Sequence, residues 1–369
     1  MAKLKYKKKD VSDKHEMFDP KTDNDLFEVL SGNELMAEAR KIKVPQMLFS
    51  EFVFEGELTM LFAPMNVGKT ILGVQIADSV TRGKPIEGFE NDASPKIVCY
   101  FDLELSKKQF QGRYAEKISK TEYINDFVWD DRINFVRFKN MIVPKGMKWV
   151  DFVFQGILKM VYKTNAEVIF IDNISWLSLQ GLEASKDAGE LMKRLDELKK
   201  KHKLTIIVLA HTPKKKNWEA MTRNDLAGSA VIGNFIDSLF TINHSRFEND
   251  EHSRYLKQLK ARSVEVIYHS RNVVTVKTCK LHSNFTGIKK IEHESLNDPY
   301  YDESEHLTFS DVPSTKKYTP KTNEEAKLKL VEVVKENPDI NARDLGEKIG
   351  RNKDTALKWK KELFNNEGK

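Results

Sequence analysis

The chain has 369 residues, of which 31% are charged and 40% are hydrophobic, and its formal net charge is +6. This composition is that of a folded globular protein and excludes wholesale disorder. The length leaves room for one large α/β domain and a smaller second one. The modest excess of basic residues permits contact with nucleic acid but does not require it.

The two cysteines, Cys99 and Cys279, both lie in apolar, strand-like runs. They are predicted to be buried thiols in a reducing compartment, because a disulfide framework needs more cysteines than this. No apolar stretch reaches the length of a membrane span, and the first residues lack the apolar core of a signal peptide. We therefore expect a cytoplasmic protein.

Residues 1–45 are predicted to form a basic mobile tail that ends in a short helix over about 33–41. The lysines of the tail are Lys3, Lys5, Lys7, Lys8 and Lys9. A lysine run at a chain end is usually solvated, so it predicts no partner by itself.

Residues 46–291 alternate apolar, strand-like runs with helical stretches. Strands are predicted over 58–62, 97–101, 133–138, 168–171, 204–209 and 238–242, and helices over 69–80, 106–113, 149–162 and 186–202. The central runs are continuously apolar, as expected for parallel strands covered on both faces. An antiparallel pair over 254–261 and 273–280 is expected at one edge. The pattern predicts a doubly wound α/β domain.

The strongest functional signal directly follows the first of these strands. The segment reads Ala63-Pro64-Met65-Asn66-Val67-Gly68-Lys69-Thr70, and Ile71 comes next in the predicted helix. It fits the nucleotide-binding P-loop, with Ala63 in place of the usual first glycine. Backbone N–H groups of such a loop bind phosphates, Lys69 adds a charge, and the Thr70 hydroxyl is placed to bind Mg²⁺. Residues 63–71 are the predicted nucleotide-binding set.

Acidic residues follow two other predicted strands. Asp172 ends an apolar run and is predicted to complete the Mg²⁺ site, because ligands of parallel sheets bind at the carboxyl ends of the strands. Hydrolysis also needs a group that orients the attacking water. Glu104 and Asp102 both follow the strand 97–101, and one of them could instead cap the next helix.

Three further residues are candidates near the nucleotide. His211 follows the strand 204–209 and could sense the terminal phosphate, or it could be an ordinary loop histidine. Lys260 and Arg262 alternate on a strand and therefore face the same side. They could reach the phosphates of a neighbouring subunit, or they could lie on a solvated edge.

The end of the chain has a different composition. Residues 292–321 are rich in Asp, Glu, Ser, Pro and Lys and are predicted to be a linker. Residues 322–369 recover helical periodicity, with Asn341 as an N-cap and Gly350 at the end of a helix. They are predicted to form a helix-turn-helix domain with a small core of Leu330, Val334, Leu345, Ile349, Ala356, Leu357 and Leu363. Its exposed cations Arg351, Lys353 and Lys358 suit DNA, although docking onto a protein is the alternative.

The order of these motifs resembles the RecA-like P-loop ATPases, and within them the RepA-type hexameric replicative helicases of plasmids and mobile elements. The resemblance covers about two-thirds of the chain. It implies a RecA-like core that binds ATP and Mg²⁺ and assembles as a homo-oligomer, most simply a hexamer. Asn173 follows Asp172 where AAA-type proteins carry Glu, so the resemblance favours Glu104 as the catalytic glutamate.

The same resemblance assigns further roles position by position. His211 would couple the terminal phosphate to DNA-binding loops, and Lys260 and Arg262 would act in the adjacent subunit's site. The loop after His211 would line a central channel for single-stranded DNA. Its contacts to the phosphate backbone would come from Lys214, Lys215, Lys216 and Arg223.

These inferences predict an ATP-driven motor on DNA, a hexameric helicase in the replication of a plasmid, phage or mobile element. The alternative is a nucleotide-dependent DNA-binding regulator or partition ATPase that does not separate strands. Basic channel loops together with a cation for the neighbouring site favour the motor, because a translocating helicase needs both.

Overall fold

The structure is a computed structural model of the whole chain. It describes residues 28–139, 141–177, 185–212, 219–226, 229–246, 250–292, 301–307, 323–338, 340–351 and 353–364. Contacts divide the chain into two units, Met1–Pro45 and Gln46–Lys369. The first unit contains α1 (Gly32–Ala39), close to the predicted helix. Ser31 caps α1, and its hydroxyl accepts a hydrogen bond from the backbone N–H of Glu34.

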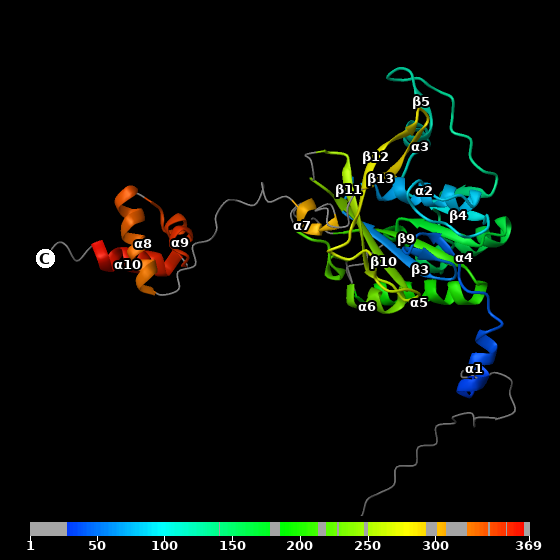
Figure 1. Cartoon of the computed structure of the whole chain (residues 1–369), viewed down its shortest axis with the longest axis horizontal. Coiled ribbons are helices and arrows are strands. Elements are labelled where there is room, and N and C mark those ends of the chain that lie inside the picture. The colour runs from blue at the N-terminus through cyan, green and yellow to red at the C-terminus, as the bar shows by residue number, and fades with distance from the viewer. Residues whose placement is uncertain are drawn as a thin grey trace, which may run out of the picture. The chain divides into compact units, whose positions relative to one another are not determined.

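The second unit is built on a nine-stranded sheet in the order β13-β12-β11-β10-β3-β9-β8-β4-β7 (Figure 1). Its strands are β3 (Leu58–Ala63), β4 (Val98–Asp102), β7 (Ile133–Val136), β8 (Val168–Asp172), β9 (Thr205–His211), β10 (Ser238–His244), β11 (Ser253–Lys260), β12 (Val274–His282) and β13 (Phe285–Lys290). The strands from β10 to β7 are parallel, and β10 to β13 pair antiparallel. Two short pairs stand apart, β1 (Met47–Phe49) with β2 (Val53–Phe54) and β5 (Glu116–Lys117) with β6 (Tyr123–Ile124).

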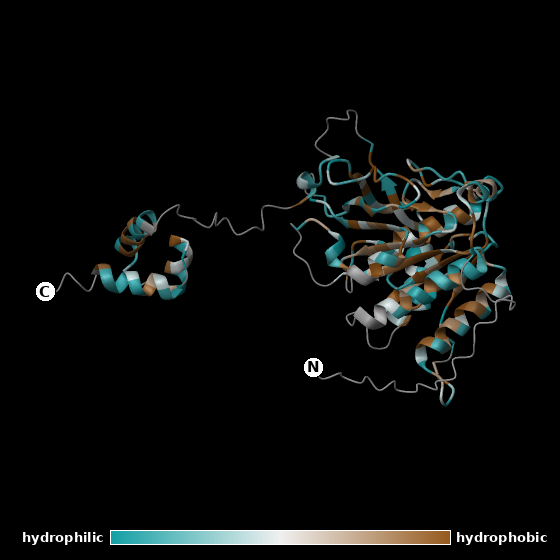
Figure 2. Cartoon of the chain, turned by 90° about the horizontal axis from the view of Figure 1, so that it is seen from below, coloured by the Kyte–Doolittle hydropathy of each residue, from teal (hydrophilic) through white to brown (hydrophobic). Residues whose placement is uncertain are grey.

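Helices cover both faces of the sheet. On one face lies α2 (Lys69–Arg82), and on the other lie α4 (Trp149–Thr164), α5 (Ser185–His202) and α6 (Ser229–Phe235). α3 (Lys107–Tyr114) follows β4. Successive residues of β3 alternate between the two cores, with Leu61 beside α2 and Met60 on the opposite face. Figure 2 shows hydrophobic residues along these strands, as a two-sided core requires.

This architecture is a RecA-like α/β fold, which confirms the predicted fold class. All six predicted parallel strands form, and so does the antiparallel pair at the edge. β13 was not predicted, because its sequence FTGIKK is short and partly polar. In the described part of the chain, no helix is long and apolar enough to cross a membrane.

The predicted linker contains a segment that belongs to the sheet domain. Residues Glu303–His306 form α7, and the Glu303 carboxylate lies 2.5 Å from the Lys257 ammonium of β11. Both side chains are at most 6% exposed. Composition alone marked this segment as linker, because its burial depends on a distant lysine.

The C-terminal segment forms three helices, α8 (Asn323–Glu336), α9 (Ala342–Ile349) and α10 (Lys353–Phe364). Asn341 caps α9 by accepting the Asp344 N–H at 2.9 Å, as predicted. Gly350 ends it with φ 64°. The buried core is Ala326, Leu330, Val333, Val334, Ile340, Leu345, Ile349, Ala356 and Trp359. The predicted core residues Leu357 and Leu363 are instead 43% and 36% exposed, and Trp359 takes their place.

Candidate functional site

The loop between β3 and α2 has the backbone of a phosphate-binding loop. β3 is buried along its length and ends at Ala63, which pairs with His211 of β9. Asn66 (φ 62°) and Gly68 (φ 108°) take left-handed conformations, which let the chain turn tightly before α2 begins at Lys69. Ala63 is fully buried as the last residue of the strand, so its methyl group lies in the core and leaves the loop open.

Lys69 and Asp172 form a buried ion pair at the carboxyl end of the sheet. Lys69 Nζ lies 2.9 Å from Asp172 Oδ1, and the two side chains are 3% and 1% exposed. The Tyr100 hydroxyl donates to the other carboxylate oxygen at 2.9 Å. Burial raises the pKa of Tyr100 well above its ordinary value, and the Asp172 charge acts in the same direction. The tyrosine therefore stays a hydrogen-bond donor to Asp172.

The residues around this pair fit a magnesium-bound nucleotide. Thr70 lies in the first turn of α2, and Asp172 ends β8. Mg²⁺ is usually held by one or two protein oxygens of this kind, while phosphate and water oxygens complete its shell. Among the described residues, no group of three or more His, Cys, Asp or Glu side chains is placed to hold a metal.

Glu104, Asn173 and His211 meet beside the ion pair. Asn173 follows Asp172, and its side-chain amide donates a hydrogen bond to Glu104 Oε1. His211 Nε2 lies 3.8 Å from the same oxygen. The side chains of Glu104 and His211 are 33% and 30% exposed, so both can reach a water molecule at the mouth of the site. A carboxylate in this position suits the orientation of an attacking water.

Asp102, the other candidate for that role, is already engaged. Its residue is 3% exposed, and its carboxylate forms an ion pair with Arg137. It also accepts a hydrogen bond from the Leu105 N–H at 3.0 Å, which fixes the turn that leads into α3. The geometry therefore favours Glu104 over Asp102 as the residue that orients water.

The end of β9 brings further polar atoms to the site. The backbone N–H of Thr212 donates to the Ala63 carbonyl at 3.1 Å, which ties β9 to the start of the loop. His211 Nδ1 and Thr212 Oγ1 are buried and have no hydrogen-bond partner in the described structure. Buried polar atoms are rarely left unpaired, so their position points to a partner supplied by a ligand or water.

Lys260 and Arg262 lie at the opposite end of the sheet from this site. Lys260 Nζ donates to the carbonyls of Gly233 and Ile236 at 2.8 and 2.5 Å. Arg262 Nη1 lies 2.6 Å from Asp237, whose carboxylate also accepts the N–H of Leu58, the first residue of β3. The P-loop follows the other end of β3. A strand of six residues spans roughly 17 Å, which separates the P-loop from Asp237 and Arg262. The two cations are therefore not part of their own chain's nucleotide site.

The predicted nucleic-acid contacts fall into three groups. Lys214, Lys215 and Lys216 lie outside the described residues. Arg223 Nε donates to the Leu259 carbonyl at 2.7 Å, beside the end of β11. In the C-terminal domain, Arg351, Lys353 and Lys358 have different surroundings. Arg351 Nη1 donates to the Gly350 carbonyl at 3.0 Å, whereas Lys353 and Lys358 are exposed on α10.

Sequence analysis missed two residues that touch the loop. Arg254 of β11 donates from Nε to the Val67 carbonyl at 2.9 Å. Thr278 of β12 lies beside Gly68, where its hydroxyl would be 3.4 Å from an added Cβ. Nothing in the local sequence marks Arg254, because its strand SRYLKQLK contains other cations. Nothing in the local sequence marks Thr278.

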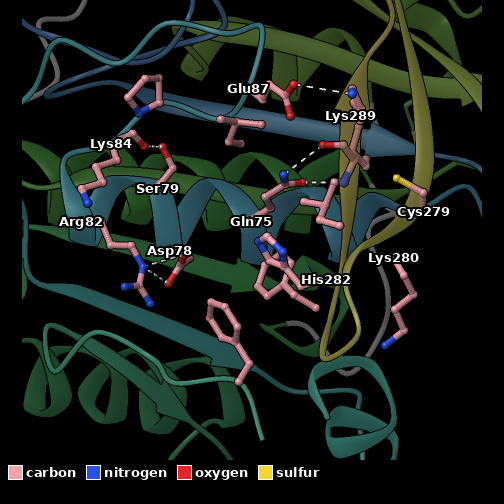
Figure 3. A pocket seen from close by; sticks show the side chains of 16 residues that line it. Gln75, Asp78, Ser79, Arg82, Lys84, Glu87, Cys279, Lys280, His282 and Lys289 are labelled. Carbon is pink, nitrogen blue, oxygen red and sulfur yellow. Dashed lines mark hydrogen bonds and ion pairs between the residues drawn. The ribbon is translucent and has the colours of Figure 1, made fainter. Parts of the chain in front are cut away.

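A cavity of about 480 Å³ lies farther along α2, against the hairpin β12–β13 (Figure 3). Across it the Gln75 amide donates to the Ile288 carbonyl at 2.9 Å and accepts the Ile288 N–H at 2.7 Å. The charged pairs at the rim are Arg82 with Asp78 and Lys289 with Glu87. None of its lining residues belongs to the P-loop, so this cavity is separate from the candidate site.

One protein family matches the part of the chain that contains the P-loop. The model of the AAA domain family matches residues 30–217, which is half of the chain. No curated protein matches the sequence. Among solved structures, a KaiC-like protein from the hyperthermophilic archaeon Pyrococcus horikoshii OT3 matches with 18% identity and a TM-score of 0.42, over 64% of this chain and 91% of that one.

Proposed function

This chain belongs to the AAA domain family, and we propose that it is an ATP-hydrolysing motor that works as a hexameric DNA helicase in the replication of a plasmid, phage or mobile element. One observation carries the proposal. The P-loop and the Lys260–Arg262 pair lie at opposite ends of one sheet. Cations so placed do not reach their own chain's nucleotide site, and in a closed ring they could serve the site of a neighbouring subunit.

In this proposal, the nucleotide is held by the P-loop. The backbone N–H groups of 65–70 and the N-terminus of α2 bind its phosphates, and Lys69 neutralises their charge. Thr70 and Asp172 would hold Mg²⁺, which when bound adds positive charge against the phosphates. Lys69 now bonds Asp172 at 2.9 Å, so it must share this carboxylate or turn toward the phosphates when nucleotide enters.

Glu104 orients the attacking water, and its own position is set by Asn173. His211 lies 3.8 Å from the same carboxylate, and its Nδ1 is free of partners in the described structure. It can therefore respond to the terminal phosphate through one nitrogen and to Glu104 through the other. Residues 213–218 follow directly and include the predicted channel lysines Lys214, Lys215 and Lys216. Hydrolysis is thus coupled to the DNA-gripping loop by chain connectivity.

The C-terminal helices supply a second contact with DNA in this proposal. Lys353 and Lys358 are exposed on α10, the second helix of the helix-turn-helix arrangement, and Arg351 precedes it. Phosphate contacts by such residues are not sequence-specific and are weakened by salt. A Lys353→Glu/Lys358→Glu variant is expected to bind duplex DNA more weakly and with a shallower salt dependence, measured by fluorescence anisotropy.

Unwinding of a forked DNA duplex tests the main proposal. The wild type with ATP should separate the strands, and Glu104→Gln should bind ATP but hydrolyse it about 10²–10⁴-fold more slowly and unwind nothing. Glu122→Gln, at an exposed carboxylate remote from the P-loop, is the matched control. An active, DNA-stimulated ATPase that never unwinds would favour the nucleotide-dependent regulator instead. Full hydrolysis by Glu104→Gln would remove Glu104 from the catalytic role.

A further inference from the structure

Strands β11, β12 and β13 lie outside the family match, and each contacts the P-loop or the helix α2 that follows it. Arg254 of β11 bonds the Val67 carbonyl at 2.9 Å, and Thr278 of β12 lies beside Gly68. Ile288 of β13 exchanges two backbone hydrogen bonds with the Gln75 side chain of α2. The family match ends at residue 217, whereas these strands span 253–290. The antiparallel extension therefore supports the outer side of a loop that the AAA domain supplies.

Arg254 is the strongest of these contacts. It is only 7% exposed, and its guanidinium donates to three backbone carbonyls. Besides Val67, these belong to Glu251 at 2.6 Å, in the turn before β11, and to Ser253 at 2.7 Å, the first residue of β11. One side chain thus ties the P-loop to the β10–β11 turn. A planar fork of N–H donors suits this task, whereas a lysine ammonium cannot make the same set of bonds.

The charge of Arg254 is also informative. In the described part of the chain, no carboxylate forms an ion pair with this guanidinium; burial lowers the pKa of Arg254, and the more distant charge of Asp250 offsets this only in part. An unpaired buried cation is costly, and carbonyl oxygens compensate it only in part. His244, which pairs with Arg254 between β10 and β11, lies in the same positive electrostatic potential. Burial first, and then the charges of Arg254 and Arg246, lower the pKa of His244 to about 4.

We propose that the extension β11–β13 is a positioning element of the nucleotide site, and that Arg254 is the positioning residue that holds the P-loop for a bound polyphosphate. This inference rests on the proposed nucleotide binding. A nucleotide in the loop would place negative charge on the inner side of Val67 and offset the cost of the buried arginine. Arg254 thus favours the nucleotide-bound form without touching the substrate, through backbone geometry and charge together.

Nucleotide binding by Arg254 variants tests this role. Arg254→Lys keeps the charge but loses the fork, and Arg254→Gln loses both. Each is expected to weaken binding of a fluorescent ATP analogue, Arg254→Lys by about tenfold, the value for one charge-assisted hydrogen bond. The loss should appear in KM, with kcat near that of the wild type, because the contact is the same in ground and transition states.

Lys289→Gln is the matched control. Lys289 is a cation of β13 in the same extension, and it pairs with Glu87 at 3.5 Å. It should bind nucleotide like the wild type. If Arg254→Lys also kept the wild-type KM while it lowered the unfolding midpoint, Arg254 would be a structural residue only and the inference would be overturned.

A measurement on the wild type removes the dependence on variants that fold. Hydrogen–deuterium exchange is compared with and without the ATP analogue. Protection of the P-loop peptide 63–71 should be accompanied by protection of the peptide 250–256, because Arg254 joins the two segments. Protection of 63–71 alone would overturn the inference. Absence of binding to the wild type would instead refute the proposed function, so the two failures are distinguishable.

Discussion

The two ends of the sheet hold the same pair of residue types and use them differently. At the carboxyl end, Lys69 pairs with Asp172 at 2.9 Å, and at the other end Lys199 pairs with Asp237 at 2.6 Å. All four side chains are at most 10% exposed. Burial and ion pairing therefore do not distinguish a site from a structural contact in this molecule.

The difference lies in what surrounds each pair. Asp237 also accepts the Leu58 N–H and the Arg262 guanidinium, so its carboxylate is saturated by the chain itself. Near Asp172, by contrast, His211 Nδ1 and Thr212 Oγ1 are buried without partners in the described structure. The P-loop, in which Asn66 and Gly68 are left-handed, also leaves its backbone N–H groups available to a ligand at this end. Thr59 Oγ1 near the far end is also unpartnered in the described structure, so the carboxyl end is distinguished by unpartnered atoms that lie beside an open phosphate-binding loop.

The largest effect on ATP hydrolysis should come from removing Arg262, the far-end cation that we propose acts in the neighbouring subunit's site. Arg262→Ala removes an exposed cation from the far end, where its side chain is 59% exposed, so stability should change little. ATP hydrolysis should nevertheless fall by about 10³-fold or more, the range for the loss of a trans-acting arginine. Steady-state phosphate release by the purified protein measures this.

Mixed oligomers provide the control for that prediction. Lys69→Met and Arg262→Ala chains are inactive separately but should regain hydrolysis when mixed, because an intact P-loop then meets an intact Arg262 of its neighbour. Arg262→Ala chains alone, at the same total concentration, should show no recovery of hydrolysis. If the mixture stays inactive although the chains co-assemble, the far end does not act in trans.

The next effect concerns the carboxyl end. Lys69→Met should reduce hydrolysis per folded molecule by about 10²–10³-fold, since a charge at the transferred phosphate is lost. Asp172 keeps the Tyr100 hydroxyl as a donor, which limits the damage to the fold. Hydrolysis normalised to the folded fraction from circular dichroism is the readout. Wild-type turnover would show that Lys69 serves Asp172 alone.

Lys199→Met is the counterpart at the far end. It leaves Asp237 buried with one cation fewer, so the free energy of unfolding should fall by about 3 kcal/mol. Turnover per folded molecule should stay at the wild-type value, because Lys199 lies behind the N-terminal end of β3. Urea unfolding gives the first quantity. A loss of turnover without a loss of stability would reverse the comparison between the ends.

Much of this site could be predicted from the sequence, because its signals are local. Continuous apolar runs marked the parallel strands, and the P-loop follows one of them. Since parallel strands end at the same edge, Glu104, Asp172 and His211 were expected together there, and the structure places them together. Whether these residues perform the predicted chemistry stays a prediction.

What the sequence did not show depends on contacts between distant elements. Arg254 reaches the P-loop across 187 residues of chain, and Glu303 is buried only because Lys257 pairs with it. In α10, Trp359 shares the face of Ala356, while Leu357 lies one position round the helix and is exposed. Local hydrophobicity cannot decide such cases, because the partner surface sets them.

The smallest predicted effect is on stability, and the two ends should respond to pH with opposite signs. His244, at the carboxyl end of β10, has its pKa lowered to about 4 by burial and by two arginines. The unfolded chain takes up this proton near pH 6.5 and the folded chain does not, so stability falls between pH 6.5 and 4. Glu57, at the far end, has its pKa raised by burial. The stabilisation that protonated Glu57 contributes is fully present below the ordinary pKa of glutamate, and it is lost as pH rises through the raised pKa of the folded state.

Urea unfolding of His244→Gln and Glu57→Gln at pH 7.5, 6.0 and 5.0 separates these contributions. Between pH 6.0 and 5.0 the wild type should lose stability through His244, by about 1 kcal/mol after allowance for solvent screening. His244→Gln should lose less than the wild type over this interval. Glu57→Gln should lose more, because it lacks the compensating gain. Equal slopes for all three proteins would mean that neither end carries a pH-dependent part of the stability, and the positive field around Arg254 would then have to be weaker than its buried position requires.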